Sequence, residues 1–239
     1  IKVGFDYKAT TEAVAAMLSQ YKGIYCMECF NPLSLVWYRK HYPQVLKYMS
    51  TTVSPMTATG RLIKAMHPDA VCVFIGPCIA KKSEVIDSIT FGGADYAMTY
   101  EELASMFEAK NIDPEECTET LQQGSKFGKQ YSVSGGVTAA VLETFKEANK
   151  EVDLKVKTCS GALECKKALM LLKVGKLPED FIEGMACVGG CVNGPAMLGK
   201  SRTFLKDRNG QIAKADDRGV LENVAQYDEY GINMTRNHQ

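Results

Sequence analysis

The chain has 239 residues, with 28 Lys and Arg balanced by 28 Asp and Glu. This length can bury a large core, and the balanced charge excludes the basic footprint of a nucleic-acid-binding protein and a polybasic membrane patch. No apolar run approaches the length needed to span a bilayer, so we expect no nucleic-acid partner and no membrane contact. Nine cysteines in a chain rich in core residues indicate reduced thiols at a metal site, and a cytoplasmic location, rather than a secreted disulfide scaffold.

Strand and helix patterns alternate through the first half of the chain. We expect strands at residues 2–6, 23–26, 70–75 and 94–98, and helices at residues 12–21 and 33–41. Ser54 and Pro55 predict a helix start, with the helix ending near Met66, because serine caps a helix and proline suits its first turn. Thr99 and Glu102 have the spacing of a capping box, which predicts another helix after the fourth strand.

The second half continues this alternation. We expect helices that start near residues 113–116 and 135–136, a strand at 154–157, a helix at 162–174, a short strand at 203–206 and a helix at 218–227. Gly175 is a suitable C-cap for the helix before it. The helix opened by Gly135 and Gly136 is expected to face an anionic cluster, because helix N-termini favour negative charge. The alternation predicts an α/β fold with largely parallel sheet.

Two cysteines, Cys187 and Cys191, stand four residues apart in the stretch 185–195, with two glycines between them. Glycine lets the backbone approach a bulky partner closely, and thiolates bind soft metals and iron–sulfur cores. The spacing is also typical of two buried structural cysteines.

A second cysteine stretch, Gly76-Pro77-Cys78-Ile79-Ala80-Lys81-Lys82-Ser83-Glu84, follows the apolar run that ends at Ile75. Open α/β sheets bind ligands at the carboxyl ends of their strands. A cysteine followed by two lysines at such a position predicts a ligand site.

These stretches resemble signatures of the iron-only, or [FeFe], hydrogenases. Residues 76–84 are similar to the second signature, M-P-C-x-x-K-x-x-E, and residues 185–191 to the third, M-A-C-P-G-G-C. Residues 131–140 are similar to the family's F-G-x-x-G-G-V-x-E-A segment. The order along the chain also fits, and the resemblance runs from about Lys2 to Pro195.

The resemblance implies two α/β lobes of mainly parallel sheet flanked by helices, with a metal cluster in the cleft between them. The H-cluster domain would span residues 1–198, and residues 199–239 would form a C-terminal extension of the same domain. Typical catalytic domains also carry a further N-terminal segment, which we expect upstream of Ile1 in a longer protein.

The resemblance also implies an H-cluster, in which four cysteines hold a [4Fe–4S] cluster and one of them bridges to a diiron unit carrying CO and cyanide. The matching motifs assign Cys78, Cys187 and Cys191 as metal ligands, with Cys191 as the bridging thiolate. The first signature, T-S-C-C-P-G-W, is degraded here to residues 26–32. We expect Cys29 to be the fourth ligand, with Cys26 as the alternative.

Three other residues take catalytic roles by the same resemblance. Lys81 would hydrogen-bond a cyanide, because an ammonium is a compact donor for an anionic ligand. Met185 would pack its flexible thioether against the diiron unit. Glu28 stands where typical members carry a proton-relaying cysteine, and a buried carboxyl group can also relay protons. The alternative interpretations are a solvated lysine, a core methionine and a surface acid.

Departures from the signatures favour a divergent, sensory type of hydrogenase with slow turnover. Gly76 replaces the methionine of the second signature, and Val188 replaces the proline of the third. The partners implied are H2 and protons, a ferredoxin-like electron carrier or accessory Fe–S domain, and the hydrogenase maturation proteins, in an anaerobic cell.

Two other functions stay open. Relatives in aerobic cells keep the cysteines, so the chain could be a non-catalytic [4Fe–4S] protein of electron transfer or cluster assembly. Lys81 and Met185 favour a diiron site instead. Four cysteines could also hold zinc in a structural domain, although the wide separation of the ligands along the chain disfavours it.

Overall fold

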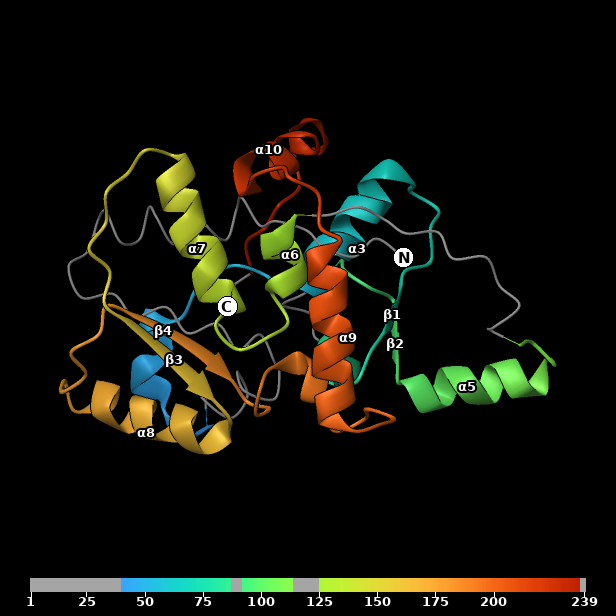
Figure 1. Ribbon diagram of the computed structural model, residues 1–239, viewed down its shortest axis with the longest axis horizontal. Coiled ribbons are helices and arrows are strands. Elements are labelled where there is room, and N and C mark those ends of the chain that lie inside the picture. Colours follow the sequence, from blue (N-terminus) through green and yellow to red (C-terminus); the bar gives the residue numbers. More distant parts are fainter. Residues whose placement is uncertain (1–39, 87–91, 114–124, 237–239) are drawn as a thin grey trace.

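The computed structural model describes residues 40–86, 92–113 and 125–236. Two groups of elements lie side by side, each built around a two-stranded parallel sheet (Figure 1). Strand β1 (Val73–Ile75) pairs with β2 (Tyr96–Met98), and β3 (Val156–Ser160) pairs with β4 (Phe181–Met185). The predicted α/β class, with parallel sheets flanked by helices, is therefore confirmed.

Helical elements make up most of the rest of the described chain. In order they are η1 (Pro43–Tyr48), α3 (Pro55–Met66), α4 (Lys81–Glu84), α5 (Tyr100–Ala109), α6 (Lys126–Gln130), α7 (Gly136–Glu147), α8 (Ala162–Lys173), η4 (Cys191–Asn193), α9 (Ser201–Ala213), α10 (Val220–Ala225) and η5 (Asp228–Tyr230). None of the helices in this part of the chain is long and apolar enough to cross a bilayer.

Local capping chemistry fixes the predicted helix starts. The Ser54 hydroxyl accepts a hydrogen bond from the Thr57 amide at 3.3 Å, and Pro55 is the first residue of α3. Before α5, the Glu102 amide donates to the Thr99 hydroxyl at 3.3 Å and the Thr99 amide donates to the Glu102 carboxylate at 2.8 Å. Both predicted starts are confirmed.

The first pair of strands is shorter than predicted, because side chains take part in the pairing. The Cys72 amide donates to the Asp95 carboxylate at 2.8 Å instead of to a strand. The other oxygen of Asp95 lies 2.6 Å from the Lys64 ammonium, which ties α3 to the start of β2. β3 begins two residues later than predicted and reaches Cys159 and Ser160.

Helices cover both faces of the β3–β4 sheet, α7 above it and α8 below it in Figure 1. All residues of β4 are buried, as expected for a parallel strand between two helical layers. On the α7 side, Phe181 and Met185 pack with Val137, Val141 and Phe145. The cluster on the α8 side comprises Tyr42, Val45, Met49, Cys159, Cys165, Ala168, Leu169, Leu172, Leu177 and Ile182.

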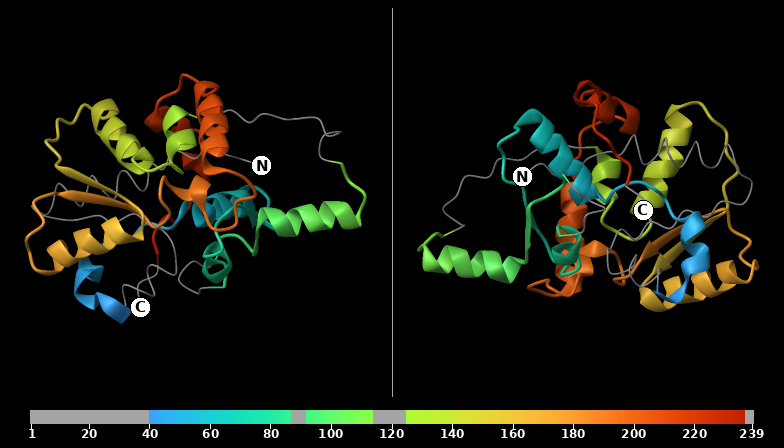
Figure 2. Two further views of the ribbon diagram at one scale, coloured as in Figure 1. Left: turned by 60° about the horizontal axis from the view of Figure 1, so that its bottom comes forward. Right: turned by 180° about the vertical axis from the view of Figure 1, so that it is seen from behind.

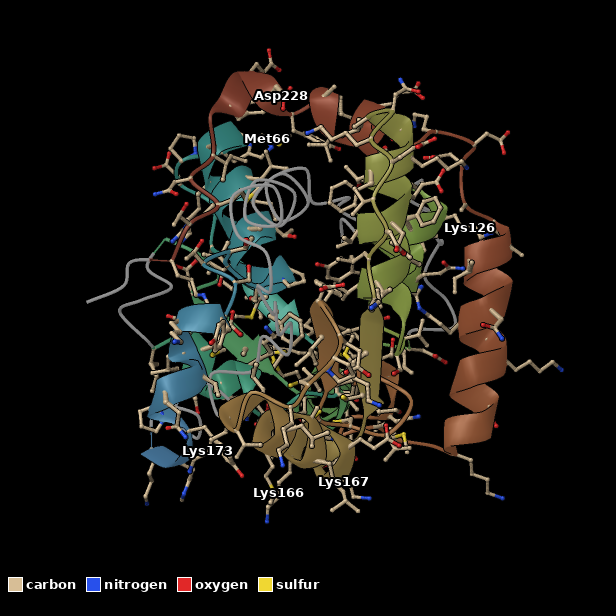
Figure 3. All side chains as sticks on the ribbon, turned by 90° about the vertical axis from the view of Figure 1, so that its left-hand side faces the viewer. Met66, Lys126, Lys166, Lys167, Lys173 and Asp228 are labelled. Atoms are coloured by element: carbon tan, nitrogen blue, oxygen red, sulfur yellow. The ribbon has the colours of Figure 1, made fainter. Side chains whose placement is uncertain are left out.

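The outer face of α8 carries positive charge. Lys166, Lys167 and Lys173 point away from the sheet in Figure 3, while Leu169 and Leu172 of the same helix are buried. The buried residues of the helix, Cys165, Ala168, Leu169 and Leu172, recur at the three- and four-residue spacing of one helical face, and the lysines lie outside it.

The predicted strand at residues 203–206 is wrong, because these residues belong to α9. Strand propensity depends strongly on context, and a short strand without a partner leaves its backbone groups unpaired. A helix satisfies most of these groups internally, and α9 lies against α6 in both views of Figure 2.

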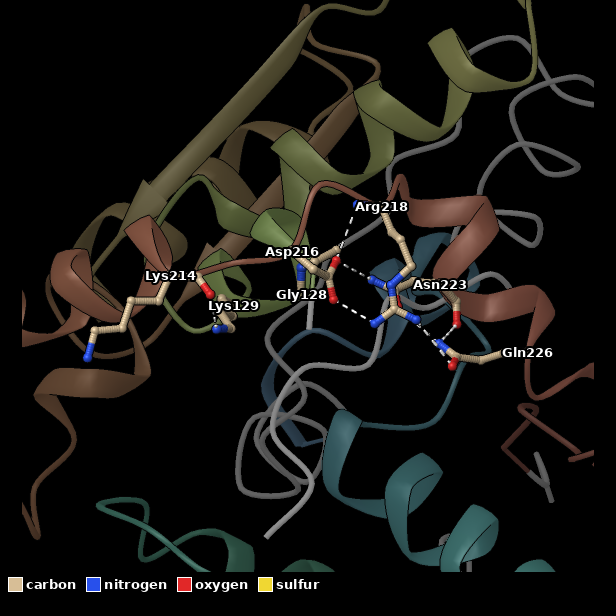
Figure 4. A network of polar contacts seen from close by, with 8 residues as sticks. Gly128, Lys129, Lys214, Asp216, Arg218, Asn223 and Gln226 are labelled. Carbon is tan, nitrogen blue, oxygen red and sulfur yellow. Dashed lines mark hydrogen bonds and ion pairs between the residues drawn. The ribbon is translucent and has the colours of Figure 1, made fainter. Parts of the chain in front are cut away.

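The segment after α9 is held by polar contacts (Figure 4). The Arg218 guanidinium donates to the Asp216 carboxylate at 2.6 Å, which raises the pKa of Arg218 above its usual value. The Gln226 amide donates to the Asn223 carbonyl oxygen at 2.7 Å. Glu147, the last residue of α7, accepts from the first amides of α10. Helix α10 confirms the helix predicted at 218–227.

Candidate metal centre

The loop between Cys187 and Cys191 is a tight turn that requires its two glycines. The Gly190 amide donates to the Cys187 carbonyl oxygen at 3.0 Å, and φ is +83° at Gly189 and +107° at Gly190. A Cβ atom on Gly190 would lie 2.5 Å from the Ser132 carbonyl oxygen. Only glycine can adopt this positive φ and fit this close contact without strain. The loop therefore has the backbone conformation that its sequence predicts.

Backbone hydrogen bonds join this loop to the segment that starts at Tyr131. The Cys191 amide donates to the Ser132 carbonyl oxygen at 2.8 Å, and the Ser134 amide donates to the Gly189 carbonyl oxygen at 3.2 Å. Two of the stretches on which the family resemblance rests therefore form one local structure.

The same loop also reaches the Cys78 segment. The Ala196 amide donates to the Pro77 carbonyl oxygen at 3.0 Å, and a Cβ atom on Gly194 would lie 2.4 Å from that oxygen. All three stretches thus meet, although they are far apart in the sequence.

Cys78 and Cys187 lie in two of the stretches that meet at this junction, and both residues are partly buried. Burial raises the pKa of the Cys187 thiol, and the charge of a nearby Cys78 thiolate raises it further. Metal binding at Cys187 therefore has to displace a proton that the folded chain holds more tightly than a free cysteine does.

Cys191 is exposed and begins the short helix η4. Among the described residues, no three His, Cys, Asp or Glu side chains converge tightly enough to hold a single metal ion. A four-iron cluster makes a different demand, because each of its cysteines ligates a separate iron atom.

Lys81 is held by a buried acid at the first turn after Cys78. Its ammonium lies 2.5 Å from a carboxylate oxygen of Glu84, and the two side chains are 12% and 2% exposed. The other oxygen of Glu84 accepts from the Thr57 hydroxyl at 2.9 Å and from the Ser54 hydroxyl. Lys81 is thus not a fully solvated lysine.

The two hydroxyl partners of Glu84 were missed by the sequence analysis. Ser54 was identified only as a helix cap, and Thr57 was not singled out. Their signal in the sequence is weak, because the hydroxyls lie at the start of α3, about thirty residues before the acid that they bind.

Met185 is 5% exposed and ends β4, where its side chain packs in the cluster with α7. Its predicted contact with a diiron unit stays a prediction. Cys26, Glu28 and Cys29 lie outside the described residues, so the fourth ligand and the proton relay also stay predictions.

The N-terminus of the helix opened by Gly135 and Gly136 binds a carboxylate of the protein itself. The Glu183 carboxylate, fully buried on β4, accepts from the Gly135 amide at 2.6 Å and from the Thr138 amide at 2.8 Å. A helix N-terminus stabilises such a charge. The sequence predicts that this helix end faces an anionic cluster, whereas in the structure its amides bind the Glu183 carboxylate of β4.

Residues 6–195 match the family described as "Iron only hydrogenase large subunit, C-terminal domain". The chain belongs to this family. Among curated proteins it is 32% identical, over 205 residues, to the periplasmic [Fe] hydrogenase large subunit of Nitratidesulfovibrio vulgaris, covering 66% of this chain and 49% of that protein. It is also 25% identical to a cytosolic Fe–S cluster assembly factor of Danio rerio, covering 80% of this chain and 59% of that protein.

The fold agrees with that of solved hydrogenases. The [FeFe]-hydrogenase HydA1 from Chlamydomonas reinhardtii superposes with a TM-score of 0.67 at 19% identity, covering 98% of this chain and 80% of that one. The chain spans about half the length of the curated relatives it matches.

Proposed function

We propose that this chain is a divergent [FeFe]-hydrogenase domain that interconverts H2 with protons and electrons, slowly or as an H2 sensor. The main support is the junction of the three signature segments, which backbone hydrogen bonds hold together and which brings the Cys78, Cys187 and Cys191 loops to one region. The match to a hydrogenase large subunit supports a catalytic role for the chain within the family.

The residues at the junction suit an iron–sulfur cluster. Cys78, Cys187 and Cys191 would supply three thiolates, and Cys29 the fourth, with Cys191 bridging to the diiron unit. Glycine at residues 190 and 194 lets these loops pack closely against the Ser132 and Pro77 carbonyl oxygens, so that the three segments can meet. When bound, the H-cluster would supply electron transfer and the binding and splitting of H2.

Lys81 would hold positive charge at this site, because Glu84 fixes its ammonium on the side of the Cys78 loop. A lysine positioned in this way can donate a hydrogen bond to an anionic ligand such as cyanide. Glu28 would carry protons between the site and solvent, and Met185 would close the apolar side. In this assignment the chain orients and neutralises the cofactor and moves protons.

The family resemblance also underlies the partners and the cellular location that we propose for this domain. A ferredoxin-like carrier or an accessory Fe–S domain would exchange electrons with it, and hydrogenase maturation proteins would load it, in the cytoplasm of an anaerobic cell. Residues 199–239 would extend the H-cluster domain, in line with the contact of α9 with α6 and η4.

A second function is supported by the likeness to the assembly factor. In that case the chain would keep a [4Fe–4S] cluster on its cysteines and lack H2 chemistry. Lys81 distinguishes the two functions, because only the first gives its ammonium a ligand to bind.

The test is H2-dependent reduction of a redox dye by the chain after iron–sulfur reconstitution and loading with a synthetic diiron cofactor. We expect measurable reduction, lowered about a hundredfold by Lys81→Met, as when one charge-stabilising donor is removed. Lys82→Met is the matched control, because this neighbouring lysine is 43% exposed and pairs with Glu102 at the surface. A chain that holds its cluster but reduces no dye would favour the second function.

A further inference from the structure

Two cysteines outside the metal centre lie together beneath the β3–β4 sheet. Cys159 is in β3 and is fully buried, and Cys165 is in the first turns of α8 and is 6% exposed. Both belong to the apolar cluster between α8 and the sheet. Neither takes part in the metal site proposed above.

The structure brings the two thiols to one point at the end of β4. Cys159 lies opposite Gly184 in the strand register, and the Cys165 sulfur lies 3.7 Å from the Met185 carbonyl oxygen. Both side chains pack in the same cluster, and hydrogen bonding to Cys165 lowers the pKa of Cys159, although burial acts in the opposite direction. The Lys157 ammonium also favours the Cys159 thiolate, which is the nucleophilic form of cysteine, whereas the Glu164 and Glu179 carboxylates disfavour it.

The backbone between these cysteines is attached to the metal-binding loop. The Ser160 hydroxyl accepts from the Gly189 amide at 2.8 Å, inside the Cys187–Cys191 turn. The Gly161 amide donates to the Met185 carbonyl oxygen at 2.7 Å, just before that turn. A change in the bonding of Cys159 and Cys165 therefore acts on residues that hold the loop.

We propose that Cys159 and Cys165 are a reversible redox pair that a peroxide oxidises to a disulfide beside the metal-binding loop. The Cys159 thiolate attacks hydrogen peroxide, which breaks the O–O bond, gives a sulfenic acid at Cys159 and releases hydroxide. The Cys165 thiol then attacks the Cys159 sulfur, which forms the S–S bond and releases the sulfenic hydroxyl as water with the Cys165 proton. The proton that Cys159 lost on forming its thiolate neutralises the hydroxide of the first step. One peroxide is reduced to two waters and two thiols are oxidised, and a small dithiol reverses the reaction by exchange.

The direct test is a peptide map of the reconstituted chain after treatment with hydrogen peroxide. Both cysteines fall in the tryptic peptide Thr158–Lys166, so the disulfide appears as the loss of two hydrogen atoms from one peptide that no longer reacts with iodoacetamide. We expect this loss and its reversal by dithiothreitol. A peptide that stays fully alkylated, or that carries sulfinic acid at one cysteine without the internal bond, would overturn the proposal.

Variants separate the pair from general thiol oxidation. Cys165→Ser should leave Cys159 without a resolving thiol, so that peroxide converts it to sulfenic and sulfinic acid instead. Cys72→Ser is the matched control, because Cys72 is also buried but its thiol contacts the Gly60 carbonyl oxygen. This variant should form the Thr158–Lys166 disulfide as the parent chain does, and its failure to do so would contradict a specific pair.

The coupling to the loop has its own measurement, which rests on the proposed iron–sulfur site. Iron release to a chelator should change severalfold between the peroxide-treated and the dithiothreitol-treated chain, and the change should vanish in Cys159→Ser. Equal release rates in the two forms would overturn the coupling, while the peptide map would still decide the disulfide. A chain that binds no iron would refute the proposed function and leave the mapped disulfide as a separate result.

Discussion

The Lys81 ammonium and the buried Glu84 carboxylate are paired at 2.5 Å within a single turn of helix, directly after Cys78. The pair connects the predicted metal centre to α3, because Glu84 also accepts from the Ser54 and Thr57 hydroxyls. Removing one partner of such a buried pair leaves the other charge without compensation. The pair is therefore expected to affect stability as well as function.

Glu84→Gln keeps the shape of the side chain but removes its charge. We expect the free energy of unfolding in urea to fall by about 2 kcal/mol, since hydrogen bonds to a charged group are worth about 1.5–3 kcal/mol. Lys82→Gln, which breaks an exposed pair, should change it by less than about 1 kcal/mol. Equal effects of the two substitutions would show that Glu84 is solvated.

Glu183→Gln tests the internal anion at the start of α7. The carboxylate accepts from the Thr138 hydroxyl at 2.7 Å as well as from the two backbone amides. We expect a loss of about 2–3 kcal/mol in the free energy of unfolding, because these bonds are charge-assisted. Glu143→Gln on the same helix, which breaks an exposed pair with Lys146, should cost less than about 0.5 kcal/mol. An unchanged free energy of unfolding in Glu183→Gln would refute this role.

Gly190→Ala tests the turn that carries the ligand cysteines. We expect a loss of about 3 kcal/mol or more, because a positive φ and a clash with the Ser132 carbonyl oxygen act together. The chain should also take up less iron and sulfide on reconstitution. Gly175→Ala is the control, since its φ is +67° but a Cβ atom there meets nothing within 4 Å, so it should cost only about 1 kcal/mol and leave iron uptake unchanged. Normal iron uptake by Gly190→Ala would contradict the role of this turn.

Asp95 gives the chain a dependence on acid pH. The Lys64 ammonium, followed by the Cys72 amide, holds the pKa of Asp95 below its usual value of 3.8. The folded state therefore favours the carboxylate, so the stability that this group contributes is present above about pH 4 and is lost as the pH falls through the lowered pKa. The difference in urea stability between the parent chain and Asp95→Asn should be constant near neutral pH and shrink below pH 4. A difference in stability that does not change between neutral and acid pH would contradict this contribution of Asp95.

Local chemistry and short motifs carried the successful sequence predictions. Ser54 and Thr99 act on amides of their own helices, so their caps can be read from nearby residues. The ligand stretches around Cys78 and Cys187 were identified through a family resemblance, and backbone hydrogen bonds bring the two stretches together in the structure.

Long-range contacts account for what the sequence did not predict. Glu183 binds amides that lie some forty-five residues earlier, and no local pattern marks it as their partner. The strand predicted at 203–206 rested on β-prone residues, whereas the observed helix depends on neighbours in α6 and η4. Such contacts are set by the assembled fold and not by propensity.

The central claim is tested most directly by infrared spectroscopy of the chain after anaerobic iron–sulfur reconstitution and addition of a synthetic diiron cofactor. We predict sharp CO and cyanide bands that shift when H2 replaces an inert gas, and cyanide bands displaced in Lys81→Met but not in Lys82→Met. A chain that shows the visible absorption of a [4Fe–4S] cluster without any CO or cyanide bands would contradict the hydrogenase assignment and support a non-catalytic iron–sulfur protein.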